Sequence, residues 1–111
     1  MYQTPSRSTL KSVLSTLKQY LEEQYPDRMS RLILFGSYAR QEATENSDVD
    51  ILIVLKDPFD ASTEIDRTSE FVAQLCLDNN LLISRLFMPE SRYETENSPL
   101  LRNIRKEGIE L

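Results

Sequence analysis

Two short segments of the sequence carry residue types that together could hold a metal-bound triphosphate. Gly36-Ser37 ends one apolar run, and Asp48-Val49-Asp50 opens another. Residues two apart on a strand point to the same face, so Asp48 and Asp50 are predicted to present their carboxylates side by side. Such a pair repels unless a cation lies between them. Mg²⁺ commonly takes one or two carboxylates together with water and substrate phosphates. The spacing therefore predicts a magnesium site at the start of a strand.

Gly36 and Ser37 have the properties that a phosphate site needs. Glycine lets the backbone approach a phosphate with no Cβ in the way. Ser37 offers a hydroxyl and an amide at the predicted start of a helix, where anions are favoured. Either segment alone is typical of a turn or a solvated strand edge, but jointly they predict a metal-bound nucleotide. Phosphoryl and nucleotidyl transfer depend mainly on positioning and on metal-borne charge, so this chemistry needs no histidine.

The composition excludes several other kinds of chemistry. The chain has no histidine, which excludes His-based zinc sites and Ser-His-Asp triads. It has a single cysteine, Cys76, which excludes an internal disulfide. We expect Cys76 to lie in the core. With 13 Lys+Arg against 18 Asp+Glu, the net charge is −5, so direct nucleic acid binding is not expected. No apolar run approaches the roughly 20 residues of a membrane span, and the polar start of the chain lacks the layout of a secretory signal. We therefore expect a cytoplasmic protein.

The elements that must position the two segments follow from the apolar pattern. The length of 111 residues indicates one domain over 1–111. Helical spacing predicts three helices, the first capped by Thr4-Pro5 or Ser6 and ending near Pro26, the others over about 60–78 and 98–108. Apolar runs predict strands at 31–35, 49–55 and 81–88, with a short helix or loop after the first. This order indicates an α/β (α+β) fold, a small mixed β-sheet flanked by helices.

The pattern Gly36-Ser37-x10-Asp48-x-Asp50 resembles the signature of the DNA polymerase β type nucleotidyltransferases, and specifically of the minimal nucleotidyltransferases. The similarity extends over nearly the whole chain, through residues 36–40, 47–54 and 98–109. It implies a mixed sheet flanked by helices, ATP bound with Mg²⁺, and transfer of AMP to an acceptor hydroxyl. It also implies site roles: Asp48 and Asp50 as the catalytic, metal-binding carboxylates, and Gly36, Ser37 and Arg40 as nucleotide-binding residues. Gln41 stands where the family usually has glycine.

The same resemblance implies a partner. Many minimal nucleotidyltransferases pair with a HEPN-domain protein in two-gene toxin–antitoxin modules, in which the nucleotidyltransferase is the antitoxin that adenylylates its toxin. We therefore expect the partner of this chain to be a HEPN-type toxin that is modified on a tyrosine. A homo-oligomer of the chain and a hetero-oligomer with the toxin are both open interpretations. At this length the chain has no second domain to hold an acceptor, which favours a protein acceptor. An enzyme that nucleotidylates an antibiotic or another small hydroxyl compound is a further interpretation.

The third predicted strand departs from the family pattern, because residues 81–88 contain no Asp or Glu. Active members place a third carboxylate there, facing the first two and often acting as general base for the acceptor. Arg85 takes this position in the register that fits best, and Ser84 takes it if the register shifts by one. Glu90, just past the strand, is another candidate. Arginine cannot act as a base at neutral pH. The alternative hypothesis is therefore a catalytically impaired nucleotide- and partner-binding module that neutralises its partner by complex formation alone.

Overall fold

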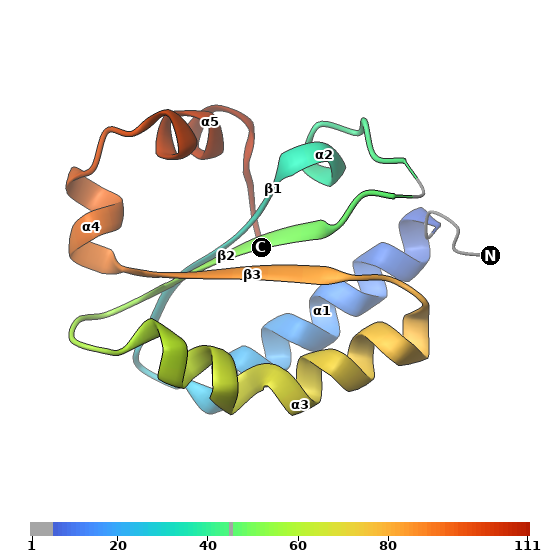
Figure 1. The fold of residues 1–111 in the computed structure, drawn as a ribbon, viewed down its shortest axis with the longest axis horizontal. Coiled ribbons are helices and arrows are strands. Elements are labelled where there is room, and N and C mark those ends of the chain that lie inside the picture. Colours follow the sequence, from blue (N-terminus) through green and yellow to red (C-terminus); the bar gives the residue numbers. More distant parts are fainter. Residues whose placement is uncertain (1–5, 45) are drawn as a thin grey trace.

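The computed structural model describes residues 6–44 and 46–111 (Figure 1). Its elements are α1 (Arg7–Gln24), β1 (Met29–Phe35), α2 (Gly36–Ala39), β2 (Val49–Leu55), α3 (Ala61–Asn79), β3 (Ile83–Pro89), α4 (Glu90–Thr95), α5 (Pro99–Glu107) and β4 (Ile109–Glu110). The expected order of helices and strands is confirmed, and two short elements, α4 and β4, were not predicted. No helix of these residues is long and apolar enough to span a membrane.

The four strands form one mixed sheet in the order β3-β2-β1-β4. β1 runs antiparallel to both β2 and β4, whereas β2 and β3 are parallel. The parallel pair needs a crossover connection, and α3 supplies it. Helices α1 and α3 lie on one side of the sheet, and α2, α4 and α5 lie on the other (Figure 1). This arrangement confirms the predicted mixed sheet flanked by helices.

The continuous apolar run of β2 results from burial on both faces. Val49, Ile51 and Ile53 belong to a large cluster that also contains the apolar residues of α1 and α3. Leu52 and Val54 belong to a second, smaller cluster, together with buried residues of α5. A strand covered on both sides reads as apolar at every position rather than at every second one. Asp50 is therefore an exception in this strand, and its alternation places it on the side of α5.

The helix ends follow the local signals of the sequence. Ser6 caps α1 by accepting a hydrogen bond from the Thr9 amide at 3.1 Å, whereas the alternative cap, Thr4-Pro5, lies outside the described residues. Asp60 caps α3 and Ser98 caps α5 in the same way. α3 ends in Asn80, which has a left-handed φ of 52°. The Leu81 amide then bonds to the Cys76 carbonyl at 3.2 Å, so β3 begins at Ile83 and not at Leu81 as predicted.

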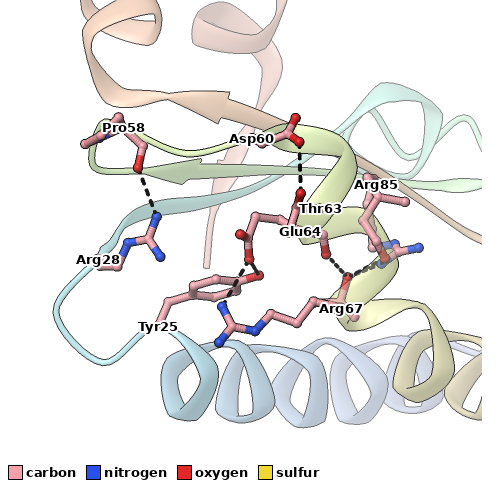
Figure 2. Close-up of polar contacts among 10 residues, drawn as sticks. Tyr25, Arg28, Pro58, Asp60, Thr63, Glu64, Arg67 and Arg85 are labelled. Carbon is pink, nitrogen blue, oxygen red and sulfur yellow. Dashed lines mark hydrogen bonds and ion pairs between the residues drawn. The ribbon is translucent and has the colours of Figure 1, made fainter.

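A buried polar contact joins the end of α1 to α3 (Figure 2). The Tyr25 hydroxyl donates to the Glu64 carboxylate at 2.7 Å, and both residues are buried. Arg67 donates to the same carboxylate at 3.3 Å. Burial, together with the adjacent Glu64 carboxylate, raises the pKa of Tyr25 well above its ordinary value. The phenol therefore stays protonated as a hydrogen-bond donor, and the contact holds the two helices together beneath the sheet.

Candidate functional site

The antiparallel register of β1 and β2 brings the two motif segments together. Phe35, the last residue of β1, pairs with Asp50, so Gly36 follows directly beside that carboxylate. Gly36 has a φ of 75°, a conformation that residues with a Cβ rarely adopt. A Cβ at this position would collide with Asp50 Oδ2 and lie 3.2 Å from Asp50 Cγ. The glycine is therefore needed twice, for the sharp turn into α2 and for the space that Asp50 occupies.

The two aspartates of the motif repel each other. Asp50 is half-buried and Asp48 is exposed. Burial raises the pKa of Asp50 above its ordinary value, the negative charge of Asp48 raises it further, and the positive charge of Arg40 opposes both effects. A divalent cation bound by both carboxylates would remove this repulsion. The arrangement thus has the charge that a cation site requires.

The donor set at this site suits a cation that is shared with a phosphate ligand. The described residues contain no group of three or more His, Cys, Asp or Glu side chains that could hold a metal by themselves. Mg²⁺ keeps several waters and is commonly held by one or two carboxylates plus substrate phosphates. Asp48 and Asp50 fit that pattern, with Gly36 and Ser37 next to them to receive the phosphates.

Arg40 lies at the end of α2, close to the paired carboxylates. Its guanidinium is 3.3 Å from Glu42 and 3.4 Å from Glu107, and about two fifths of the side chain is exposed. Exposed ion pairs of this kind are weak, so a phosphate could replace these partners. The next residue, Gln41, has a φ of 60°. This left-handed conformation gives a physical reason for the glycine that the family usually has there.

The register of β3 corrects the prediction that Arg85 faces the aspartates. Asp50 pairs with Ser84, and Ile51 pairs with Arg85. Paired residues of parallel strands point to the same side of the sheet, so the exposed Ser84 lies beside Asp50 and Arg85 points to the opposite face. The alternative register, shifted by one residue, was the right one. In the position of the third carboxylate this chain therefore has a serine hydroxyl.

Arg85 instead ties β3 to α3 (Figure 2). Its guanidinium donates to the Ile65 carbonyl at 3.3 Å, to the Ser69 hydroxyl at 3.4 Å and to the Thr68 hydroxyl. Burial lowers the pKa of Arg85 from its ordinary value. These contacts lie on the α3 side of the sheet, so Arg85 is a structural residue that leaves the face of the aspartates open.

Glu90 also lies too far away to replace the missing carboxylate. Leu55, the last residue of β2, pairs with Pro89, so Glu90 lies at the opposite end of the sheet from Asp50. Its carboxylate accepts a hydrogen bond from the Ser30 hydroxyl. Figure 1 shows the same separation, with α4 at one end of the sheet and α2 at the other.

A hollow of about 450 Å³ adjoins Asp48, and sequence reasoning did not anticipate it. Its lining comes from residues 46–48 before β2, from the end of α3, including Leu77, and from the turn between α3 and β3, including Asn80 and Leu82. Leu77 and Leu82 are 77% and 60% exposed, the two most exposed of the large apolar side chains that the structure describes. Leu82 falls within the strand predicted over 81–88, and Leu77 was not assigned to the apolar face of its helix, so the sequence did not mark the two as parts of one surface.

Taken together, a mixed sheet with paired aspartates at the start of a central strand, next to a glycine-serine turn, defines a nucleotidyltransferase. Residues 14–107 match the family model described as "Nucleotidyltransferase domain". The chain belongs to this family.

Several relatives and solved structures resemble the chain over most of its length. It is 34% identical over 89 residues to the Methanocaldococcus jannaschii protein named "Putative protein adenylyltransferase MJ0604", covering 79% of this chain and 83% of the relative. It is 27% identical over 99 residues to "Putative protein adenylyltransferase MJ0141" of the same organism, covering 89% and 95%.

Among solved structures, a mutant of the toxin-antitoxin MntA-HpeT matches with a TM-score of 0.56 and 18% identity, over 87% of this chain and 70% of that one. A structure described as "a putative nucleotidyltransferase from Sulfolobus solfataricus" matches with a TM-score of 0.57 and 19% identity, over 95% of this chain and 86% of that one. A toxin-antitoxin structure with AMP-PNP also matches, with a TM-score of 0.57 and 18% identity, over 84% and 68%. These matches show that the fold is shared.

Proposed function

We propose that this protein transfers AMP from Mg²⁺-ATP to a tyrosine hydroxyl of a HEPN-type toxin and so acts as its antitoxin. The observation that carries the proposal is the placement of Asp50 against Gly36, which joins a carboxylate pair to a phosphate-binding turn. The relatives named as protein adenylyltransferases and the toxin-antitoxin structures of the same fold support the activity and the kind of partner.

In this proposal the residues of the chain mainly position the reactants. Asp48 and Asp50 would hold Mg²⁺, which would supply charge stabilisation at the reacting phosphate. The backbone at Gly36 and the hydroxyl of Ser37 hold the β- and γ-phosphates, and Arg40 exchanges its carboxylate partners for them. The acceptor oxygen attacks the α-phosphorus, the bond from that phosphorus to the pyrophosphate oxygen breaks, and AMP remains on the acceptor.

The serine beside Asp50 bears on which acceptor the site can use. With Ser84 in register with Asp50, β3 offers no carboxylate at this position to take the acceptor proton. The proton then passes to water, which reaches the exposed Ser84. A phenol loses its proton at a pKa of about 10, whereas water holds its proton far more tightly, and an aliphatic hydroxyl is likewise a much weaker acid than a phenol. A tyrosine is therefore a more suitable acceptor than a serine or a sugar.

The test is a transfer reaction followed by intact-mass measurement. The purified protein is incubated with Mg²⁺-ATP and the protein encoded by the neighbouring gene, and both masses are read. We expect one or more added adenylyl groups on the partner, located to tyrosine by peptide mapping. The variant with Asp48→Asn and Asp50→Asn should show none, because it cannot hold the cation.

The alternative function, a module that neutralises its partner by binding alone, is favoured by one observation. Ser84 occupies the position where active members have a third carboxylate. In that case the mass of the partner would stay unchanged while a stable complex forms. The double aspartate variant would then protect against the toxin as well as the wild type does.

A further inference from the structure

The hollow beside Asp48 has an apolar rim that the folded chain leaves uncovered. Leu77, near the end of α3, and Leu82, just before β3, both line it and are largely exposed. The Val49 amide bonds to the Leu82 carbonyl at 2.8 Å, so Leu82 lies directly alongside the first residue of β2. Asp48 lines the same hollow. One of the two motif carboxylates thus belongs both to the cation site and to this apolar surface.

The order of the strands places the hollow on the side from which an acceptor must come. Asp50 has Phe35 and the turn at Gly36 on one flank, and Ser84 of β3 on the other. Attacking and leaving oxygens lie roughly in line at a transferred phosphoryl group. If the leaving pyrophosphate is held at Gly36, on the β1 flank of Asp50, the attacking hydroxyl must approach from the opposite flank, where β3 lies. Leu82 immediately precedes β3, and the bond from the Val49 amide to its carbonyl places it at the end of the sheet where β2 and β3 begin.

We propose that the hollow rimmed by Leu77 and Leu82 is the docking site for the tyrosine-bearing segment of the protein acceptor. This inference rests on the proposed function and adds where the partner binds. A volume of about 450 Å³ with three leucines in its lining suits an aromatic side chain and an apolar neighbour. Binding there would place the phenol oxygen next to Asp48, one of the two carboxylates that would hold the cation.

The charges around the hollow specify the acceptor further. Asp48 is the single charged residue among the described residues that line it, and it is acidic. Asp78, which follows Leu77, is exposed and bonded to Gln74 at 2.7 Å. With no lysine or arginine in the lining, the surface complements a segment that carries a basic residue near its tyrosine. An acidic segment would be repelled, which gives the site a preference among tyrosines.

The experiment measures partner binding and transfer separately for Leu77→Lys and Leu82→Lys. Both positions are exposed, so the substitutions leave the core intact, and Ile109→Lys is the matched control. Ile109 is 45% exposed and lies in β4, at the opposite edge of the sheet. We expect each rim variant to raise the KM for the partner by about tenfold or more, which corresponds to about 1.4 kcal/mol. The Kd for AMP-PNP should not change, and the control should match the wild type in both.

Partner affinity is also measured in the Asp50→Asn background, where no transfer occurs. Weaker partner binding by the rim variants in this background supports the docking site even if the wild type transfers no AMP, an outcome in which only the proposed function fails. Transfer by the wild type with an unchanged KM in both rim variants overturns the docking site and leaves the function standing. A loss of AMP-PNP affinity in the rim variants also overturns it, because the hollow would then hold the nucleotide base.

Discussion

Replacing Gly36 with alanine tests whether the turn after β1 is shaped around the Asp50 carboxylate. The backbone at Gly36 has a φ of 75°, and an added Cβ would meet Asp50 Oδ2 as well as Cγ at 3.2 Å and Cβ at 3.4 Å. Three atoms of one side chain lie in the way, so a small rotation of the carboxylate alone does not make room. Either the backbone leaves the left-handed region or Asp50 moves to another rotamer.

The magnitude follows from these two strains. A left-handed conformation costs a residue with a Cβ about 1–2 kcal/mol, and forcing a side chain off its rotamer costs about 0.5–1.5 kcal/mol. Gly36→Ala should therefore lower the free energy of unfolding by roughly 1.5–3.5 kcal/mol, the sum of these two costs. For a domain of this size, Tm should fall by about 4 °C for each kcal/mol. Displacing a positioned catalytic group by about 1 Å can cost about 100-fold in rate.

The assay compares Tm and the rate of AMP transfer, measured well below the melting temperature. Gly108→Ala is the control, because its φ is not left-handed but its Cβ would lie 2.7 Å from Ile33 Cγ2 and 2.5 Å from the Ile104 carbonyl oxygen. That variant should lose stability and keep its transfer rate per folded molecule. Gly36→Ala should lose both. Wild-type transfer and an unchanged Tm in Gly36→Ala would refute the reasoning.

Three further outcomes are expected. In metal-free buffer, Asp50→Asn should be more stable than the wild type at pH 7 in thermal melts. Because the pKa of Asp50 is raised, the folded protein binds the Asp50 proton more tightly than the unfolded chain does, and the stability of the wild type falls as the pH rises above about 3.8. An identical pH dependence of Tm in the two proteins would contradict this. Ser84→Asp places a carboxylate in register with Asp50, where it can act as a base, and should raise the transfer rate by about 100-fold or more in mass-resolved time courses. A rate at or below that of the wild type argues against this role. Tyr25→Phe leaves the buried Glu64 without a 2.7 Å hydrogen bond and should cost about 1–3 kcal/mol in urea denaturation, with transfer unchanged.

The sequence alone was sufficient for most of the features that depend on neighbouring residues, although it missed the short helix α4 and the turn that delays the start of β3. Ser6, Asp60 and Ser98 mark the starts of their helices because a cap acts within one turn of chain. The apolar run of β2 predicts a strand buried on at least one face, and Asp50 stands out in it because a carboxylate is costly there. The spacing of Gly36-Ser37 and Asp48-x-Asp50 was enough to expect a phosphate site next to a cation site.

Tertiary structure decided the features that depend on how separate elements meet. The apolar run before Pro89 is compatible with two registers against β2, and a shift of one residue exchanges the faces of Ser84 and Arg85. Hydrogen bonds from Arg85 to α3 accompany the observed register, and nothing local to β3 encodes them. β4 pairs through only two residues, too few to form a pattern. The close approach of Asp50 to Gly36 and the exposure of Leu82 likewise arise only when β1, β2 and β3 are assembled into the sheet. Periodicity tells which residues share a face, but it does not tell what lies opposite them.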